Sequence, residues 1–296
     1  MINPLNSYRK TRIAPTPSGF LHLGNVLSFC ITASLARKRG ASILLRIDDL
    51  DQPRVNDQYI QDIFNTLNFL EIPWDEGPRD VKEFKDSYSQ QHRLPLYEKA
   101  IEELRDNRLV FACTCTRRQV NARLSCNCLG RGGLSTENAS LRLITGDKGE
   151  LSIKTYNGQI QSIALPRDMK DFVVKRKDGL PAYQLTSMID DLFYGIDLIV
   201  RGGDLWPSTL AQYQLALSLG RNDFREICFH HHPLLNEASG NKLSKSAGST
   251  SVRYLREIGK RPVDIFRIIA TMLSIDETVI SWQQLSELVI DQQNFN

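Results

Sequence analysis

The sequence contains no long apolar run and no strong excess of one charge. No stretch approaches about 18 uninterrupted apolar residues, the length of a membrane helix, and the first residues lack the basic start and apolar run of an export signal. The 37 Lys and Arg against 34 Asp and Glu leave a net charge of only +3, which excludes a histone-like cation but permits an anionic partner. We therefore expect a cytoplasmic protein that binds no membrane.

The composition is that of an ordinary globular protein. The 296 residues are 41% hydrophobic and 24% charged, enough to bury a core in one large domain or two modest ones. Six cysteines in a chain of this length without an export signal indicate metal binding or burial rather than disulfides.

The first part of the chain has the pattern of a βαβ unit. A short strand ends near Ile13, apolar residues then recur at helical spacing as far as Gly40, and residues 42–47 are typical of a buried strand. Ligands of such a unit bind at the carboxyl ends of the strands. We therefore expect the Pro- and Gly-rich loop at residues 15–25 to lie at a binding site.

A second α/β pattern follows an irregular segment. Residues 113–165 hold four cysteines and short alternating runs, which predict a small inserted domain with β-hairpins. Strands are expected at 197–200 and 226–229 on either side of a helix at 206–219, and the tail from about residue 251 is predicted helical. Capping-box patterns in this tail begin at Ser274 and Ser281.

Two segments have residue patterns suited to phosphate. In the first, His22 and Gly24 stand at the expected start of a helix, where amides, the positive helix dipole and an imidazole can meet an anion. In the second, residues 240–248 interleave two lysines with hydroxyls between glycines. Each pattern alone is common in surface loops. Together they indicate a site that holds a polyphosphate.

The same two segments match the HIGH and KMSKS signatures, so the chain resembles the class I aminoacyl-tRNA synthetases. The matching residues are His22-Leu23-Gly24-Asn25 and Lys242-Leu243-Ser244-Lys245-Ser246. Further segments resemble the glutamyl/glutaminyl branch of that class: Arg12 to Gly19, Arg46-Ile47-Asp48-Asp49, Ala182-Tyr183-Gln184-Leu185, Asp190-Asp191 and Val200-Arg201-Gly202-Gly203-Asp204. The resemblance runs from about residue 9 to about residue 250.

The length of the chain distinguishes between families of this branch. A full glutamyl-tRNA synthetase carries a large anticodon-binding region after KMSKS, whereas this sequence ends about 50 residues later. In this respect the chain is similar to the glutamyl-queuosine tRNA(Asp) synthetase family. That resemblance implies ATP-dependent activation of L-glutamate without tRNA, with Mg²⁺, followed by transfer to the queuosine base in the anticodon loop of tRNA(Asp), by a monomer.

The implied fold is α/β, a Rossmann-type class I catalytic domain with a small zinc-containing insertion and a short helical C-terminal tail. We expect residues 1–108 to form the first half of the catalytic domain and 109–168 an acceptor-binding-like subdomain that contains the zinc. Residues 169–250 then complete the catalytic domain with the KMSKS-type loop, and 251–296 form the helical tail.

The resemblance also assigns site residues. Catalysis is expected from His22, Lys242 and Lys245. ATP binding is expected from His22, Gly24, Asn25, Lys242, Ser244 and Lys245, and glutamate binding from Arg12, Ala14, Thr16, Asp48, Tyr183 and Arg201. The chain departs from the family at two of these positions.

Asp48 stands where glutamyl families usually have Glu, which makes the pocket one methylene wider. Asn25 replaces the final histidine of HIGH, but an amide can still donate a hydrogen bond to a phosphate or a ribose. We therefore do not expect Asn25 to inactivate the site.

The paired cysteines predict one structural zinc ion per chain. Cys113 and Cys115 are followed, after ten residues, by Cys126 and Cys128, and four thiolates can close a tetrahedral site. The family pattern has a tyrosine and a further cysteine after the first pair, so here Cys126 and Cys128 are expected to substitute. Four unrelated reduced cysteines are the alternative.

Two other functions stay open at this point. One is an adenylate-forming amino-acid ligase of the same fold with another acceptor, such as a tRNA 3′ end or a small molecule. The other is a noncatalytic tRNA-binding paralogue, which has no need of both phosphate motifs. His230, His231 and His232 are expected to be structural, because consecutive residues of a strand point to alternate faces.

Overall fold

The computed structural model describes residues 7–116, 119, 128–129, 133–134, 136–146, 149–235 and 251–295. These residues form two compact units. The first is drawn from residues 1–92, 198–203 and 230–296, and the second from residues 93–197 and 204–229. The four-part division expected from the resemblance stays a prediction.

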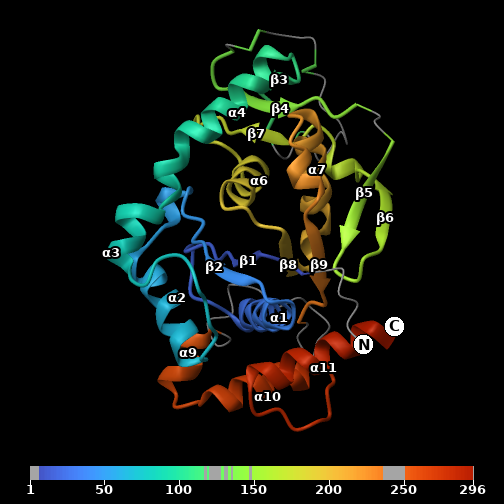
Figure 1. Ribbon diagram of the computed structural model, residues 1–296. Helices are drawn as coiled ribbons and strands as arrows, with labels where there is room; N and C mark the ends of the chain where they lie inside the picture. The colour runs from blue at the N-terminus through green and yellow to red at the C-terminus, as the bar shows by residue number, and fades with distance from the viewer. Residues whose placement is uncertain are drawn as a thin grey trace. The chain divides into compact units, whose positions relative to one another are not determined.

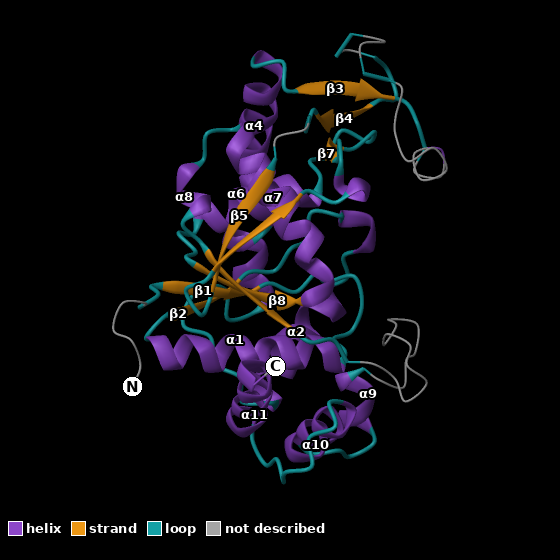
Figure 2. Cartoon of the chain, turned by 90° about the vertical axis from the view of Figure 1, so that its right-hand side faces the viewer, coloured by secondary structure: helices purple, strands orange, loops and turns teal. Residues whose placement is uncertain are grey.

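The first unit contains the predicted βαβ motif. Strands β1 (Lys10–Ile13) and β2 (Ser42–Leu45) pair in parallel, with Arg12 opposite Leu44, and β1 also contacts β8 (Leu198–Gly202). Helix α1 (Leu23–Arg39) connects β1 to β2 and lies along all three strands (Figures 1 and 2). The βαβ unit expected from the sequence is confirmed here.

Helix α1 is buried on almost all sides. The strands cover one side, and α10 (Pro262–Met272) and α11 (Trp282–Phe295) pack against another (Figure 2). This enclosure explains why even Thr32 and Ser34 are buried, because a helix enclosed by its neighbours has no fully solvated face. The helix ends as predicted, with a basic last turn and Gly40 in the left-handed conformation at φ 74°.

The remaining helical elements of the first unit surround this core. They are a 3₁₀ turn (Gln52–Arg54), α2 (Asp57–Phe69), α3 (Val81–Glu83), a π turn (Phe84–Tyr88), a 3₁₀ turn that crosses into the second unit (Gln90–Arg93) and α9 (Val252–Glu257). The helical tail is therefore confirmed.

Of the two capping boxes predicted in the tail, the one at Ser281 is formed in part. Ser281 accepts a hydrogen bond from the Gln284 amide at 3.3 Å, where α11 begins, and the Gln284 side chain accepts from the Ile280 amide at 3.1 Å, one residue before the cap. The prediction at Ser274 is wrong, because Ser274 has a left-handed backbone (φ 56°) and ends the turn after α10 instead of starting a helix.

Gly77 follows a residue that pairs with β2 and lies close to the β2 backbone. Glu76 forms a parallel bridge with Leu44, and the Leu45 amide donates to the Glu76 carbonyl at 2.9 Å. Gly77 has φ 98°, and a Cβ atom there would lie 2.3 Å from the Leu45 carbonyl oxygen. Only glycine fits this position.

The second unit combines two groups of strands with helices. Strands β3 (Val110–Cys113), β4 (Ser140–Leu143) and β7 (Val173–Lys175) form an antiparallel sheet, and β5 (Glu150–Thr155) forms a hairpin with β6 (Ile160–Ala164). The hairpins expected for residues 113–165 are thus present among the described residues.

The helices of the second unit pack on these strands. They are α4 (Leu94–Asp106), α6 (Tyr183–Phe193), α7 (Trp206–Ser218) and α8 (Asn222–Arg225), with short 3₁₀ turns at Arg167–Met169 and Gly203–Leu205. Helix α6 contacts α4, α7 and β7 (Figure 1). Strand β9 (Cys228–His232) starts two residues later than predicted, and its first two residues pair in parallel with β5. None of the described helices has both the length and the apolar character that crossing a membrane requires.

Candidate active site

His22 caps the N-terminus of α1. Its Nδ1 accepts a hydrogen bond from the Gly24 amide at 3.1 Å, and its own amide donates to Oδ1 of Asn25 at 3.0 Å. Because Nδ1 accepts, the neutral ring carries its proton on Nε2 and can donate from there. The first turn of α1 contains no acidic residue, so the positive end of the helix dipole favours an anion.

Gly24 fits tightly against the His22 ring. A Cβ atom at this position would lie 3.0 Å from Cε1 and 3.1 Å from Nδ1 of His22. A glycine at position 24 therefore leaves the space that the His22 ring occupies.

A second cluster forms where β1 and β2 end. The hydrogen bonding of the two strands continues past them, since the Arg46 amide donates to Ile13 and the Asp48 amide donates to Pro15, each at 2.9 Å. This pairing places the loop with Ala14 and Thr16 next to Asp48. The structure thus brings three of the predicted glutamate-binding residues to one edge of the sheet, with Thr16 exposed and Asp48 buried.

Asp48 is held by a buried guanidinium group. Nε of Arg46 donates to Oδ1 at 2.8 Å and Nη2 donates to Oδ2 at 3.0 Å, while the Arg46 side chain is only 1% exposed. Such a two-pronged pair fixes the plane of the carboxylate. The shorter side chain at position 48 is therefore held in a defined orientation.

Arg12 and Arg201 lie on the neighbouring strands β1 and β8. Nη1 of Arg12 donates to the Val200 carbonyl at 3.2 Å, and both arginines are less than a tenth exposed. Burial, together with the charge of Arg201 and of the adjacent histidines, lowers the pKa of His231 to about 3. This corner of the site therefore combines buried guanidinium groups with a neutral imidazole, an environment suited to a carboxylate.

The other predicted residues lie elsewhere. Tyr183 is the first residue of α6 in the second unit and is 45% exposed. Three predicted ATP-binding residues and one predicted zinc ligand fall outside the described residues: Lys242, Ser244, Lys245 and Cys126.

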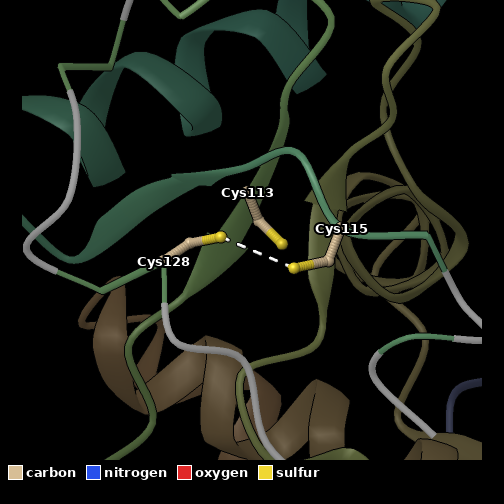
Figure 3. Close-up of side chains that lie close together, drawn as sticks. All are labelled: Cys113, Cys115 and Cys128. Carbon is tan, nitrogen blue, oxygen red and sulfur yellow. Dashed lines mark hydrogen bonds between the residues drawn. The ribbon is translucent and has the colours of Figure 1, made fainter. Parts of the chain in front are cut away.

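Three cysteines of the second unit lie together (Figure 3). The sulfur atoms of Cys113, Cys115 and Cys128 all lie within 4.8 Å of one another, and those of Cys115 and Cys128 are 3.6 Å apart. Thiolates around one tetrahedral zinc ion lie about 3.8 Å apart, given Zn–S bonds of about 2.3 Å. This cluster has the spacing of a metal site, and its chemistry suits a soft or borderline ion.

Sequence reasoning assigned no binding role to Arg46 and expected His231 to be structural. Arg46 could have been found, because residues two apart in an extended segment lie on the same face, as Arg46 and Asp48 do. His231 had no such signal, since its environment depends on Arg201 of another strand.

Comparison with known proteins fits this geometry. Residues 9–289 match a family model described as tRNA synthetases class I (E and Q), catalytic domain. The chain belongs to this family. A glutamyl-Q tRNA(Asp) synthetase from Pseudomonas aeruginosa is 35% identical over 263 residues, which cover 85% of each protein. A protein from Nitrosococcus oceani named glutamate–tRNA ligase 2 is 32% identical over 89% of this chain and 59% of its own length.

Solved class I synthetases share the fold. The glutamate-tRNA synthetase of Elizabethkingia anophelis superposes with a TM-score of 0.72 at 21% identity, over 95% of this chain and 65% of the other. The relatives are named synthetases or ligases, so this class I chain is an enzyme.

Proposed function

We propose that this class I synthetase activates L-glutamate with ATP and transfers it to queuosine in the anticodon loop of tRNA(Asp). The observation that carries the proposal is the joining of two subsites by one short segment. Residues 12–25 supply Arg12 and the loop beside Asp48 at one end and the His22-capped helix at the other. An amino acid and a phosphate chain bound there would lie next to each other.

Glutamate recognition needs cations for its carboxylates and an anion for its ammonium group. Arg12 and Arg201 are buried and suit a carboxylate, while Asp48 supplies the anion. Arg46 orients Asp48 through its two hydrogen bonds. Ala14, Thr16 and Tyr183 are proposed to complete the pocket.

Activation joins the α-carboxylate of glutamate to the α-phosphorus of ATP. An oxygen of the carboxylate attacks in line, the bond to the bridging oxygen breaks, and pyrophosphate leaves with the electron pair. His22 is proposed to donate from Nε2 to a phosphate oxygen, helped by the positive end of the α1 dipole and by the side-chain amide of Asn25, while Gly24 leaves room for the His22 ring. Lys242, Ser244 and Lys245 are proposed to bind the same phosphates, whose charge Mg²⁺ bound with ATP would help to neutralise.

Transfer then needs no protein nucleophile. A hydroxyl of the queuosine cyclopentene ring attacks the carbonyl carbon of glutamyl-adenylate, and AMP leaves as the new ester forms. The acceptor follows from the likeness to the Pseudomonas relative and its name. The likeness to glutamate–tRNA ligase 2 makes a tRNA 3′ end the second candidate acceptor.

The cysteine cluster is proposed to hold one structural zinc ion. Cys113, Cys115 and Cys128 supply three thiolates at suitable spacing, and Cys126 is the proposed fourth ligand. A fully ligated ion leaves no position for substrate, so its role would be to cross-link the segment between β3 and β4.

The test is transfer of labelled glutamate, with ATP and Mg²⁺, to tRNA(Asp) prepared with and without queuosine. We expect label only on the queuosine-containing tRNA, and in its anticodon fragment after nuclease digestion. Removal of the 3′-terminal adenosine should not affect the reaction.

Each other outcome rejects part of the proposal. Label on tRNA(Glu), lost with its 3′-terminal adenosine, would establish the second candidate instead. Glutamate-dependent exchange of pyrophosphate into ATP without any transfer would retain the activation step and reject the acceptor. Absence of exchange would reject the proposed substrate.

A further inference from the structure

Helix α9 is tied to the His22 loop through the backbone. Ser251 forms an antiparallel bridge with His22, and the Val252 amide donates to the Leu21 carbonyl at 2.8 Å. Ser251 also caps α9, since its Oγ accepts from the Tyr254 amide at 3.2 Å. The helix therefore begins on the residue that pairs with the first residue of the HIGH-type motif.

Side chains reinforce this attachment at Phe20. The guanidinium carbon of Arg253 lies 4.5 Å from the centroid of the Phe20 ring, which is a cation–π contact. Tyr59 of α2 meets the same ring edge-on, with centroids 4.8 Å apart and planes at 89°. Phe20 is thus held between α9 and α2, two residues before His22.

Asp62 forms a second attachment on the other side of Leu21. It lies on α2, is 3% exposed, and accepts a hydrogen bond from Nη2 of Arg256 at 3.1 Å. Burial raises the pKa of Asp62, and the opposing effects of Arg256 and of the hydrogen bond from the Leu21 backbone only partly offset this rise. One buried carboxylate therefore joins α2, α9 and the His22 loop.

These few polar contacts lie beside an open space rather than a packed interface. A cavity of about 650 Å³ lies between α2 and α9, lined among others by Phe20, Asp62, Arg253 and Arg256. Val252 and Leu255 are buried on another side of α9. On the side that borders the cavity, apolar packing cannot hold the helix, because a cavity supplies no contacts there. On that side Arg253 and Arg256 supply the contacts to Phe20 and Asp62.

We propose that Arg253 and Arg256 are positioning residues that set the affinity for ATP by holding α9 against the His22 loop through Phe20 and Asp62. In sequence, α9 follows the KMSKS-type motif, with Ser251 six residues after Lys245. A shift of α9 would therefore move Ser251, where the described chain resumes after that motif, relative to His22. The inference rests on the proposed function, because it assigns both motifs to ATP.

Arg253 gives the sharper test, since its side chain is 39% exposed and its removal leaves no buried charge. We expect Arg253→Ala to raise KM for ATP about tenfold in glutamate-dependent pyrophosphate exchange, as expected from loss of a contact that positions a phosphate group. KM for glutamate should not change, and Arg253→Lys should restore most of the loss because it keeps the cation. Phe20→Leu should raise KM for ATP as much as Arg253→Ala does. The double variant that combines Phe20→Leu with Arg253→Ala should have a KM for ATP no higher than that of either single variant.

Arg267→Ala provides the control, because Arg267 is an exposed arginine on the neighbouring α10. Its kinetics and those of the unchanged enzyme should agree. Exchange that is present in the unchanged enzyme and identical in Arg253→Ala would overturn the inference. A rise in both KM values, or a fall in melting temperature that Arg253→Lys does not restore, would also overturn it by showing a merely structural role. Absence of exchange in the unchanged enzyme would reject the proposed function instead.

Discussion

Arg93 donates two parallel hydrogen bonds to Asp190 inside the second unit. Nε donates to Oδ1 at 2.7 Å and Nη2 donates to Oδ2 at 3.1 Å. Asp190 is completely buried and Arg93 is 4% exposed. The hydroxyl of Tyr97 donates to the same carboxylate at 2.6 Å, and burial and the nearby charge of Asp190 raise the pKa of Tyr97. The pair therefore joins the start of α4 to α6.

Breaking this pair should destabilise the protein strongly. In Asp190→Asn, the buried guanidinium of Arg93 loses its counter-charge, and we expect a loss of about 3–5 kcal/mol in the free energy of unfolding, measured in urea. Asp86→Asn is the matched control, because its pair with Lys82 is exposed and should contribute little. A loss from Asp190→Asn as small as the control's would contradict the argument.

His231 should make stability depend on pH. Its pKa is lowered from 6.5 to about 3, first by burial and then by the charge of Arg201. Between pH 6.5 and about 3, His231 is therefore protonated in the unfolded chain and neutral in the folded chain. Stability from this group is complete above pH 6.5 and falls as the pH drops towards 3. We expect His231→Gln to flatten this part of the stability curve, and NMR to show a neutral His231 ring at pH 5. A protonated ring at that pH would contradict the prediction.

Gly24→Ala should lower the activity by displacing the His22 ring. The added methyl group would lie 3.0 Å from the ring, and a displaced ring loses both its cap and its position towards phosphate. The ring need move only by a few tenths of an ångström, so we expect a loss of about tenfold in kcat/KM for ATP, less than the roughly 10²-fold cost of a 1 Å displacement. Gly19→Ala is the control in the same loop, because a Cβ atom there meets nothing within 4 Å. Equal activity of the two variants would show that the ring can move without consequence.

Metal analysis should find one zinc ion per chain. We expect Cys113→Ser to abolish binding and to lower the melting temperature, since metal bound only by the folded chain stabilises it. Cys228→Ser should retain the metal, because Cys228 lies on β9 and is not part of the cluster. Full zinc content in Cys113→Ser would reject the site.

The sequence predicted elements whose signals are local. The strand before Ile13, the helix that ends at Gly40 and the helix at 206–219 all have regular apolar spacing or a glycine stop, and all are confirmed. Helix α6 was not predicted, because Asp190 and Asp191 interrupt its apolar pattern while being fully buried. Their burial depends on a partner such as Arg93, which lies 97 residues away from Asp190.

The same distinction applies to the candidate site. His22 was found because its motif is contiguous, and Arg46 could have been found from its spacing to Asp48. The attachment of α9 to α2 could not have been predicted, since Asp62 and Arg256 are 194 residues apart and belong to no common sequence motif. Pairs formed by the fold alone leave no trace in a single sequence.

The cap that His22 places on α1 also affects how this protein could evolve. The ring satisfies the Gly24 amide at the start of the 17-residue helix at the centre of the first unit, and loss of an N-cap typically costs about 1 kcal/mol. A descendant that had abandoned catalysis would still be selected to keep this histidine for stability. Retention of the histidine in a degenerate relative is therefore weak evidence of activity.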